Sequence, residues 1–136
     1  MPEVELPMKP LALLTFAMIL NAGLYSGMAA AAGDAEAGAK LFTKTCGGCH
    51  SVGENARGSF GPQLNGVIGR AAGSTADYQY SEAMKNSGVV WTREKLAAYI
   101  ESPKKVVSGT RMIFWGISDQ EKIDNLLAYL ETFQGQ

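Results

Sequence analysis

Apolar residues recur at helical spacing most clearly near the C-terminus of the chain. Intervals of three, four and seven residues place four of them on one helix face: Ile123, Leu126, Leu127 and Leu130. The preceding run Ser118-Asp119-Gln120-Glu121 has the form of a capping box. We therefore expect a last helix that follows a cap at Ser118 and packs one apolar face on a core.

A first helix is expected from Ala35 to about Thr45. Asp34 is a good N-cap, and Glu36 places a negative charge in the first turn, where the helix dipole favours it. Gly38 inside this helix costs stability relative to alanine. A glycine at that position indicates a close packing contact with another element.

The middle of the chain is mostly loop. Residues 47–73 hold eight glycines and Pro62. A short helix is expected at Ser81–Asn86, and another from a Thr92 cap through Ile100, stopped by Pro103. Val106–Trp115 is expected to be an irregular apolar loop. No strand alternation is present, so the fold class is all-α, small and loop-rich, and its long loops need something to enclose.

The N-terminal segment has a different character. Leu11–Ala32 carries no charge and is long enough to cross a bilayer as a helix. Small residues precede Gly33, as in a signal-peptidase site, and a start at Met8 would supply the basic N-terminus that export favours. We expect residues 1–32 to be a cleaved signal peptide. A retained membrane anchor and a core helix are the alternatives, and residues 33–136 form the domain.

Charge and composition exclude several functions. The chain has 12 basic and 13 acidic residues, a net charge of −1, so it offers no strongly basic surface for nucleic acid. It contains two cysteines and one histidine. These are too few for a four-ligand Cys/His zinc site, and they exclude any function that needs two histidines. A nucleophilic enzyme with one histidine remains possible on counts alone.

The run Cys46-Gly47-Gly48-Cys49-His50 carries the most specific chemistry in the chain. Cys-x-x-Cys-His is the attachment site of a c-type haem. Each thiol adds to one haem vinyl group, and the adjacent imidazole reaches the iron. A disulfide would leave His50 unexplained, a thioredoxin-type pair needs a βαβ setting, and a zinc half-site lacks its other half.

The haem iron has a second axial position, which a second histidine cannot fill. Methionine, lysine, tyrosine or the N-terminal amine could occupy it, or it could stay open to water or gas. Met84 and Met112 are the two methionines after residue 32. A lone methionine is usually core filler, and that interpretation is kept for Met84.

Several motifs in the same order resemble those of the class I c-type cytochromes, the family of mitochondrial cytochrome c and its bacterial electron-shuttle relatives. The resemblance covers residues 33–133. Besides the CGGCH site, it rests on GPQLNG at 61–66, Gly69-Arg70, Tyr80-Ser81, Trp91, Tyr99, SPKK at 102–105, GTRMIF at 109–114 and LAYL at 127–130.

The resemblance implies a role for each matching residue. His50 and Met112 would be the axial ligands of a single covalent haem c, and the Pro62 carbonyl would hold the other ring nitrogen of His50. Tyr99 would lie beside the Met112 sulfur. The haem propionates would be surrounded by Arg70, Tyr80, Trp91 and Thr110. Gly38 and Phe42 would cross the last helix near Leu126 and Tyr129.

The implied function is a soluble, monomeric one-electron carrier of the periplasm, which is not an enzyme and has no small-molecule substrate. Its transient partners would be a membrane oxidase, a bc-type complex, a photosynthetic centre or a periplasmic dehydrogenase. The alternatives are a haem peroxidase or gas-binding protein with a displaceable methionine, and a membrane-anchored cytochrome module. Three departures from the family stand out: Ser108 replaces a proline, Met84 replaces a common asparagine, and Trp115 replaces a small residue.

Overall fold

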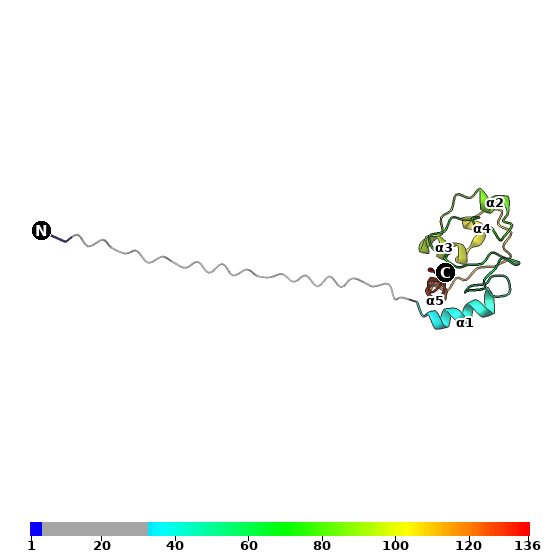
Figure 1. Ribbon diagram of the computed structural model, residues 1–136, viewed down its shortest axis with the longest axis horizontal. Coiled ribbons are helices and arrows are strands. Elements are labelled where there is room, and N and C mark those ends of the chain that lie inside the picture. The colour runs from blue at the N-terminus through cyan, green and yellow to red at the C-terminus, as the bar shows by residue number, and fades with distance from the viewer. Residues whose placement is uncertain (4–32) are drawn as a thin grey trace.

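Five helices form the ordered framework of the part of the chain that the structure describes, residues 1–3 and 33–136. In this computed structural model (Figure 1) the helices are joined by loops, and one isolated antiparallel bridge pairs Ala71 with Val90. The expected all-α, loop-rich class is confirmed. The segment predicted to be a signal peptide or anchor lies outside the described residues. No helix within them has the length and apolar character needed to cross a membrane.

Helix α1 (Ala35–Thr45) has the predicted bounds and the predicted cap. The Asp34 side chain accepts hydrogen bonds from the backbone N–H groups of Glu36 (2.8 Å) and Ala37 (3.1 Å). These bonds satisfy two of the N–H groups that a helix leaves free at its N-terminus. At the other end, the Cys46 N–H donates to the Phe42 carbonyl, so the helix ends directly at the first cysteine.

Helix α5 (Gln120–Glu131) buries the face predicted from the sequence, since its four buried residues are Ile123, Leu126, Leu127 and Leu130. The predicted start was wrong by one residue. Asp119, not Ser118, is the N-cap, and its carboxylate accepts from the Lys122 N–H at 3.3 Å. Both residues are good caps, and the position at which the chain turns onto the core decides between them.

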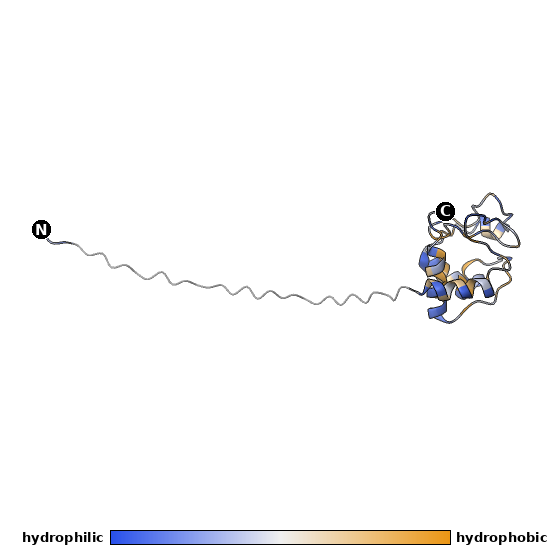
Figure 2. Cartoon of the chain, turned by 60° about the horizontal axis from the view of Figure 1, so that its bottom comes forward, coloured by the Kyte–Doolittle hydropathy of each residue, from blue (hydrophilic) through white to orange (hydrophobic). Residues whose placement is uncertain are grey.

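The helices α1 and α5 cross at a point where only glycine fits. A Cβ on Gly38 would lie 1.9 Å from the Asn125 carbonyl oxygen and 2.8 Å from the Tyr129 Cβ. Beside this contact the rings of Phe42 and Tyr129 lie 5.5 Å apart. The close contact inferred from the helix glycine is therefore present. Figure 2 shows apolar residues mainly where the helices meet and polar residues mainly on their outer sides.

The remaining helices are α2 (Glu82–Lys85), α3 (Arg93–Glu101) and α4 (Pro103–Val106). The Ser81 and Thr92 side chains cap α2 and α3. The prediction that Pro103 only ends a helix was incomplete, because Pro103 also begins α4. Its fixed φ and missing N–H suit the first turn of a helix as well as they disfavour the interior of one.

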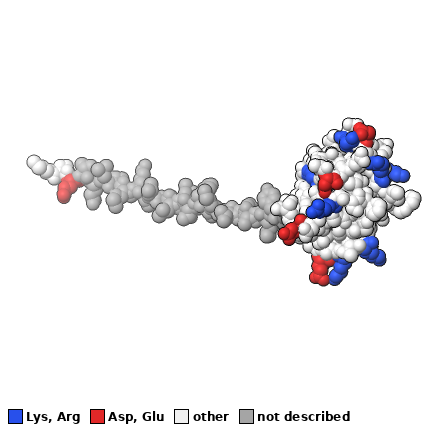
Figure 3. All heavy atoms as spheres, turned by 45° about the vertical axis from the view of Figure 1, so that its right-hand side comes forward, with Lys and Arg blue, Asp and Glu red and all other residues white. Residues whose placement is uncertain are grey.

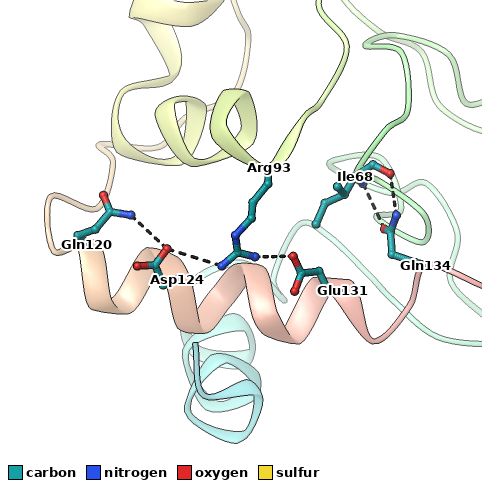
Figure 4. Close-up of polar contacts among 6 residues, drawn as sticks. All are labelled: Ile68, Arg93, Gln120, Asp124, Glu131 and Gln134. Carbon is teal, nitrogen blue, oxygen red and sulfur yellow. Dashed lines mark hydrogen bonds and ion pairs between the residues drawn. The ribbon is translucent and has the colours of Figure 1, made fainter. Parts of the chain in front are cut away.

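Side chains also tie the C-terminal helix to the rest of the fold (Figure 4). The Arg93 guanidinium on α3 reaches two carboxylates of α5, those of Glu131 and, at 3.7 Å, Asp124. Past the end of α5, the Gln134 amide exchanges two hydrogen bonds with the Ile68 backbone, at 3.2 and 2.7 Å. These contacts hold α5 against both α3 and the long glycine-rich loop.

Gly38→Ala should destabilise the protein by about 1–3 kcal/mol, because the new methyl group would overlap a backbone carbonyl that cannot rotate away. In an exposed helix the same change would stabilise by about 0.5–1 kcal/mol. Denaturant unfolding followed by circular dichroism measures the difference. Gly135→Ala is the matched control, since nothing lies within 4 Å of its added Cβ. An unchanged or raised stability of the Gly38 variant would contradict the proposed crossing.

Candidate cofactor site

A cavity of about 360 Å³ opens between the glycine-rich loop, α2, α3 and the segment 110–114. All ten residues expected to surround the cofactor line it: Cys46, Cys49, His50, Pro62, Arg70, Tyr80, Trp91, Tyr99, Thr110 and Met112. The fold brings them together from positions as far as 66 residues apart in the chain. A cavity of this size inside so small a domain is the space that the long loops enclose.

The cysteines reach the cavity through a tight turn at the end of α1. The N–H groups of Cys49 and His50 both donate to the Cys46 carbonyl, at 3.0 and 2.9 Å. The two thiols are not joined to each other. Burial, with a smaller contribution from Cys49, raises the pKa of Cys46 to about 11, so this thiol is neutral at pH 7. A neutral thiol is a poor match to a thioredoxin-type redox pair, which needs a thiolate.

The His50 ring is held in one orientation by the backbone. Its Nδ1 lies 2.8 Å from the Pro62 carbonyl oxygen, which can only accept, so Nδ1 carries the proton. The Nε2 lone pair is then free to bind a metal. Burial lowers the pKa of His50, against a smaller opposing effect of the Pro62 hydrogen bond, and thereby favours the neutral form that ligates.

Gly61 leaves the space that the imidazole occupies. A Cβ at this position would lie 2.5 Å from the His50 Cε1 atom. The Gly61 N–H also donates to the Cys49 carbonyl at 2.9 Å, which joins the loop to the cysteine turn. The residue before Pro62 must therefore be small for the histidine to keep its place.

The methionine side of the cavity is organised by a pair of hydroxyl groups. The Tyr99 hydroxyl and Thr110 Oγ1 lie 2.7 Å apart, and the Met112 N–H donates to the same Thr110 oxygen at 3.3 Å. The Trp91 ring packs against Tyr99 with centroids 4.8 Å apart. Burial raises the pKa of Tyr99, so the hydroxyl keeps its proton and its hydrogen bond at neutral pH.

Polar groups gather around Arg70. Its guanidinium donates to the carbonyl oxygens of Asn65 (2.8 Å) and Gln63 (2.9 Å), and Tyr80 pairs with Thr75 at 2.6 Å. Burial lowers the pKa of Arg70, but a guanidinium stays charged in a protein. A half-buried positive charge at the wall of an apolar cavity suits an anionic group on a cofactor.

Other lining residues were not predicted from the sequence. Phe60, Leu64, Val67, Tyr78 and Leu96 also line the cavity. One signal was available for Tyr78, because Tyr78 and Tyr80 are two residues apart and face the same way in an extended segment. Their rings meet edge to face at 4.9 Å. Met84 lines the cavity as well, from α2, so it is not merely a core residue.

Comparisons with known proteins agree with these observations. The family model for cytochrome c matches residues 35–134. Cytochrome c2 of Blastochloris viridis is 46% identical over 104 residues, which cover 76% of this chain and 81% of that protein. Cytochrome c-554 of Methylosinus trichosporium is 42% identical over 126 residues, which cover 93% and 95% of the two chains.

A solved structure is similar as well. Cytochrome cH from Methylobacterium extorquens aligns with a TM-score of 0.68 and 46% sequence identity, over 74% of this chain and 99% of that one.

Tyr99→Phe should lower the free energy of unfolding by about 1 kcal/mol, because a buried hydroxyl pair loses one partner. Tyr78→Phe is the matched control. Its hydroxyl donates to the Phe60 carbonyl at 3.1 Å in an exposed setting, where water replaces the lost bond, so its effect should stay below about 0.5 kcal/mol. Denaturant unfolding of both variants tests whether Tyr99→Phe lowers the free energy of unfolding more than Tyr78→Phe does. A larger loss in Tyr78→Phe would contradict the role assigned to Tyr99.

Proposed function

The chain belongs to the cytochrome c family, and on that premise we propose that it carries single electrons between larger redox proteins. The observation that carries the proposal is the cavity in which Cys46, Cys49, His50 and Met112 meet. One covalent c-type haem belongs to this family's architecture, and its iron supplies a ferric/ferrous couple when bound. The residues of this chain hold the haem, orient it and exclude water.

The cavity suits the haem in its chemistry as well as its size. The thiols of Cys46 and Cys49 would form the two thioethers, and the free Nε2 of His50 would ligate the iron. The Pro62 carbonyl fixes the imidazole through Nδ1 and makes it a better donor. Gly61 keeps the space beside the ring clear.

Met112, which lines the same cavity, would be the second protein ligand of the iron. The Tyr99 and Thr110 hydroxyl pair anchors the backbone next to it, since the Met112 N–H donates to Thr110 Oγ1. A thioether ligand in an apolar cavity favours ferrous iron and therefore a high reduction potential. Arg70, Tyr80 and Trp91 would face the haem propionates, with Arg70 supplying the opposing charge.

A chain that fills both axial positions leaves no open site for a substrate. This favours an electron carrier over the two enzyme-like alternatives, a haem peroxidase and a gas-binding protein. Electron transfer then requires only that partners approach the haem edge. Contact of this kind is small and transient. The partners would be respiratory or photosynthetic complexes or a periplasmic dehydrogenase.

Residues 1–32 would be a signal peptide, which places the mature domain in the periplasm. The uncharged run and the small residues before Gly33 support export. The match to cytochrome c-554 of Methylosinus trichosporium covers 126 residues, or 93% of this chain, which is more than residues 33–136 alone can supply. That relative therefore has a counterpart for part of residues 1–32. A retained anchor would instead make the protein a membrane-bound module.

Mass spectrometry of the protein purified from its own cells should give the mass of residues 33–136 plus one haem. The motif requires two thioethers, so Cys46→Ala with Cys49→Ala should yield no covalent haem and no folded protein. A folded double variant without haem would contradict haem attachment. An intact mass that includes residues 11–32, found only in membranes, would contradict cleavage and favour the anchored form.

Met112→Ala should remove the weak red charge-transfer band of a ferric iron bound by methionine sulfur. It should also allow the ferrous protein to bind carbon monoxide at neutral pH, which the unaltered protein should not do. Met84→Leu is the matched control, because Met84 lines the same cavity from α2. It should retain the band and exclude the gas. If Met84→Leu loses the band and Met112→Ala keeps it, the ligand is Met84. Rapid gas binding by the unaltered protein would favour the gas-binding alternative.

A further inference from the structure

Large apolar side chains are exposed mainly beside the cavity. Within residues 33–136, the exposed ones are Phe60 (84%), Val90 (49%), Ile113 (97%) and Trp115 (98%). Phe60 and Ile113 line the cavity, and Trp115 lies two residues beyond Ile113. A tryptophan is normally well buried, so a fully exposed one next to a functional cavity indicates a surface that another molecule covers.

The exposure of Trp115 follows from the path of the chain. From Arg111 to Trp115 the residues alternate between exposed and half-buried, as in an extended strand. Met112 and Phe114 point toward the cavity and pack against the core. The conformation that partly buries Met112 and Phe114 therefore leaves Arg111, Ile113 and Trp115 exposed, and of these three Arg111 and Ile113 still border the cavity.

The segment that presents Trp115 is held at both ends. At one end the Thr110 N–H donates to the Val107 carbonyl (3.1 Å), and Thr110 pairs with Tyr99. At the other end Gly116 has a φ of +94°, and a Cβ there would lie 2.0 Å from the Glu101 carbonyl oxygen. The Ile117 N–H then donates to the Ile100 carbonyl. A backbone that is already held in place loses little conformational entropy when a side chain on it binds a partner.

The two segments that present these apolar side chains carry basic residues but no acidic ones, although Asp77 and Glu101 directly adjoin them in the chain. Residues 55–76 and 102–118, which contribute Phe60, Ile113 and Trp115, include no aspartate or glutamate. Their exposed cations are Arg57, Lys104, Lys105 and Arg111. Over the wider face drawn in Figure 3, basic and acidic residues are interspersed, so long-range steering is weak. A partner would therefore recognise this surface mainly through short-range apolar contact, with the cations at its border.

We propose that Trp115 is the anchor by which this protein docks on its redox partner. The partner is a protein with an apolar recess beside its own redox centre and carboxylates around that recess. Interfaces of this type have an apolar centre and a polar rim, and tryptophan and arginine are enriched among the residues that dominate their energy. This inference rests on the proposed electron-carrier function and specifies what the partner must offer.

The test uses the haem-loaded protein with washed membranes and with soluble extract from its own cells. The rate of its oxidation or reduction is measured against its concentration, at low and at high salt. Trp115→Ala should raise KM about tenfold at both salt concentrations and leave kcat unchanged. Trp115→Phe should restore most of the affinity. Val90→Ala is the matched control, because Val90 is exposed but does not line the cavity.

Two measurements separate docking from damage to the site. Oxidation by ferricyanide and the methionine-sulfur band should be the same in Trp115→Ala as in the unaltered protein. A KM unchanged within twofold, or a change in either of these two measurements, would overturn the inference.

A separate experiment tests whether Trp115 contacts a lipid surface instead of a protein. Binding to phosphatidylglycerol vesicles that Trp115→Ala abolishes, with KM unchanged, would assign the surface to lipid and overturn the inference. If neither cell fraction exchanges electrons with the unaltered protein, the proposed function itself fails, and the inference fails with it.

Discussion

The close crossing of α1 and α5 is the contact on which the rest of the structure depends. Gly38 allows the two backbones to approach so closely that no Cβ fits between them. This contact fixes the direction of α1, and the end of α1 is where the chain turns through Cys46 to His50. A shift of the crossing would move the cysteines and the histidine together. A packing constraint between helices thus sets the position of the chemistry.

The cavity explains why so short a chain tolerates long loops. The described core is small, and its largest fully buried side chains, Ile123, Leu126 and Leu127, all come from α5. On the other side of the domain the loops face the cavity, not a core of their own. A bound haem would fill that space and supply the apolar contacts that loops of this composition lack.

The segment 110–116 serves two purposes through one conformation. Its extended path alternates side chains, so Met112 and Phe114 are half-buried against the core while Arg111, Ile113 and Trp115 are exposed. The Thr110 hydrogen bonds and the tight fit of Gly116 against the end of α3 hold that path. Residues that would ligate the haem and residues that would meet a partner are therefore positioned by the same few contacts. Electron transfer would benefit, because a partner bound at Trp115 would lie next to the segment that helps to hold the haem.

The sequence by itself determined the helical class, the buried face of α5 and the close approach at Gly38, because the spacing of residues is a local property of the chain. Ten of the residues around the cavity were also predicted, most of them through the resemblance to class I c-type cytochromes. The tertiary structure decided those features for which the local sequence offers two equally good alternatives. Ser118 and Asp119 both cap well, and Pro103 both ends one helix and begins another, so packing selects the boundary. Tyr78 and Met84 reach the cavity only because the fold turns them there. The exposure of Trp115 was equally undetermined, since an apolar side chain turns outward only where the path of the backbone leaves it no place inside.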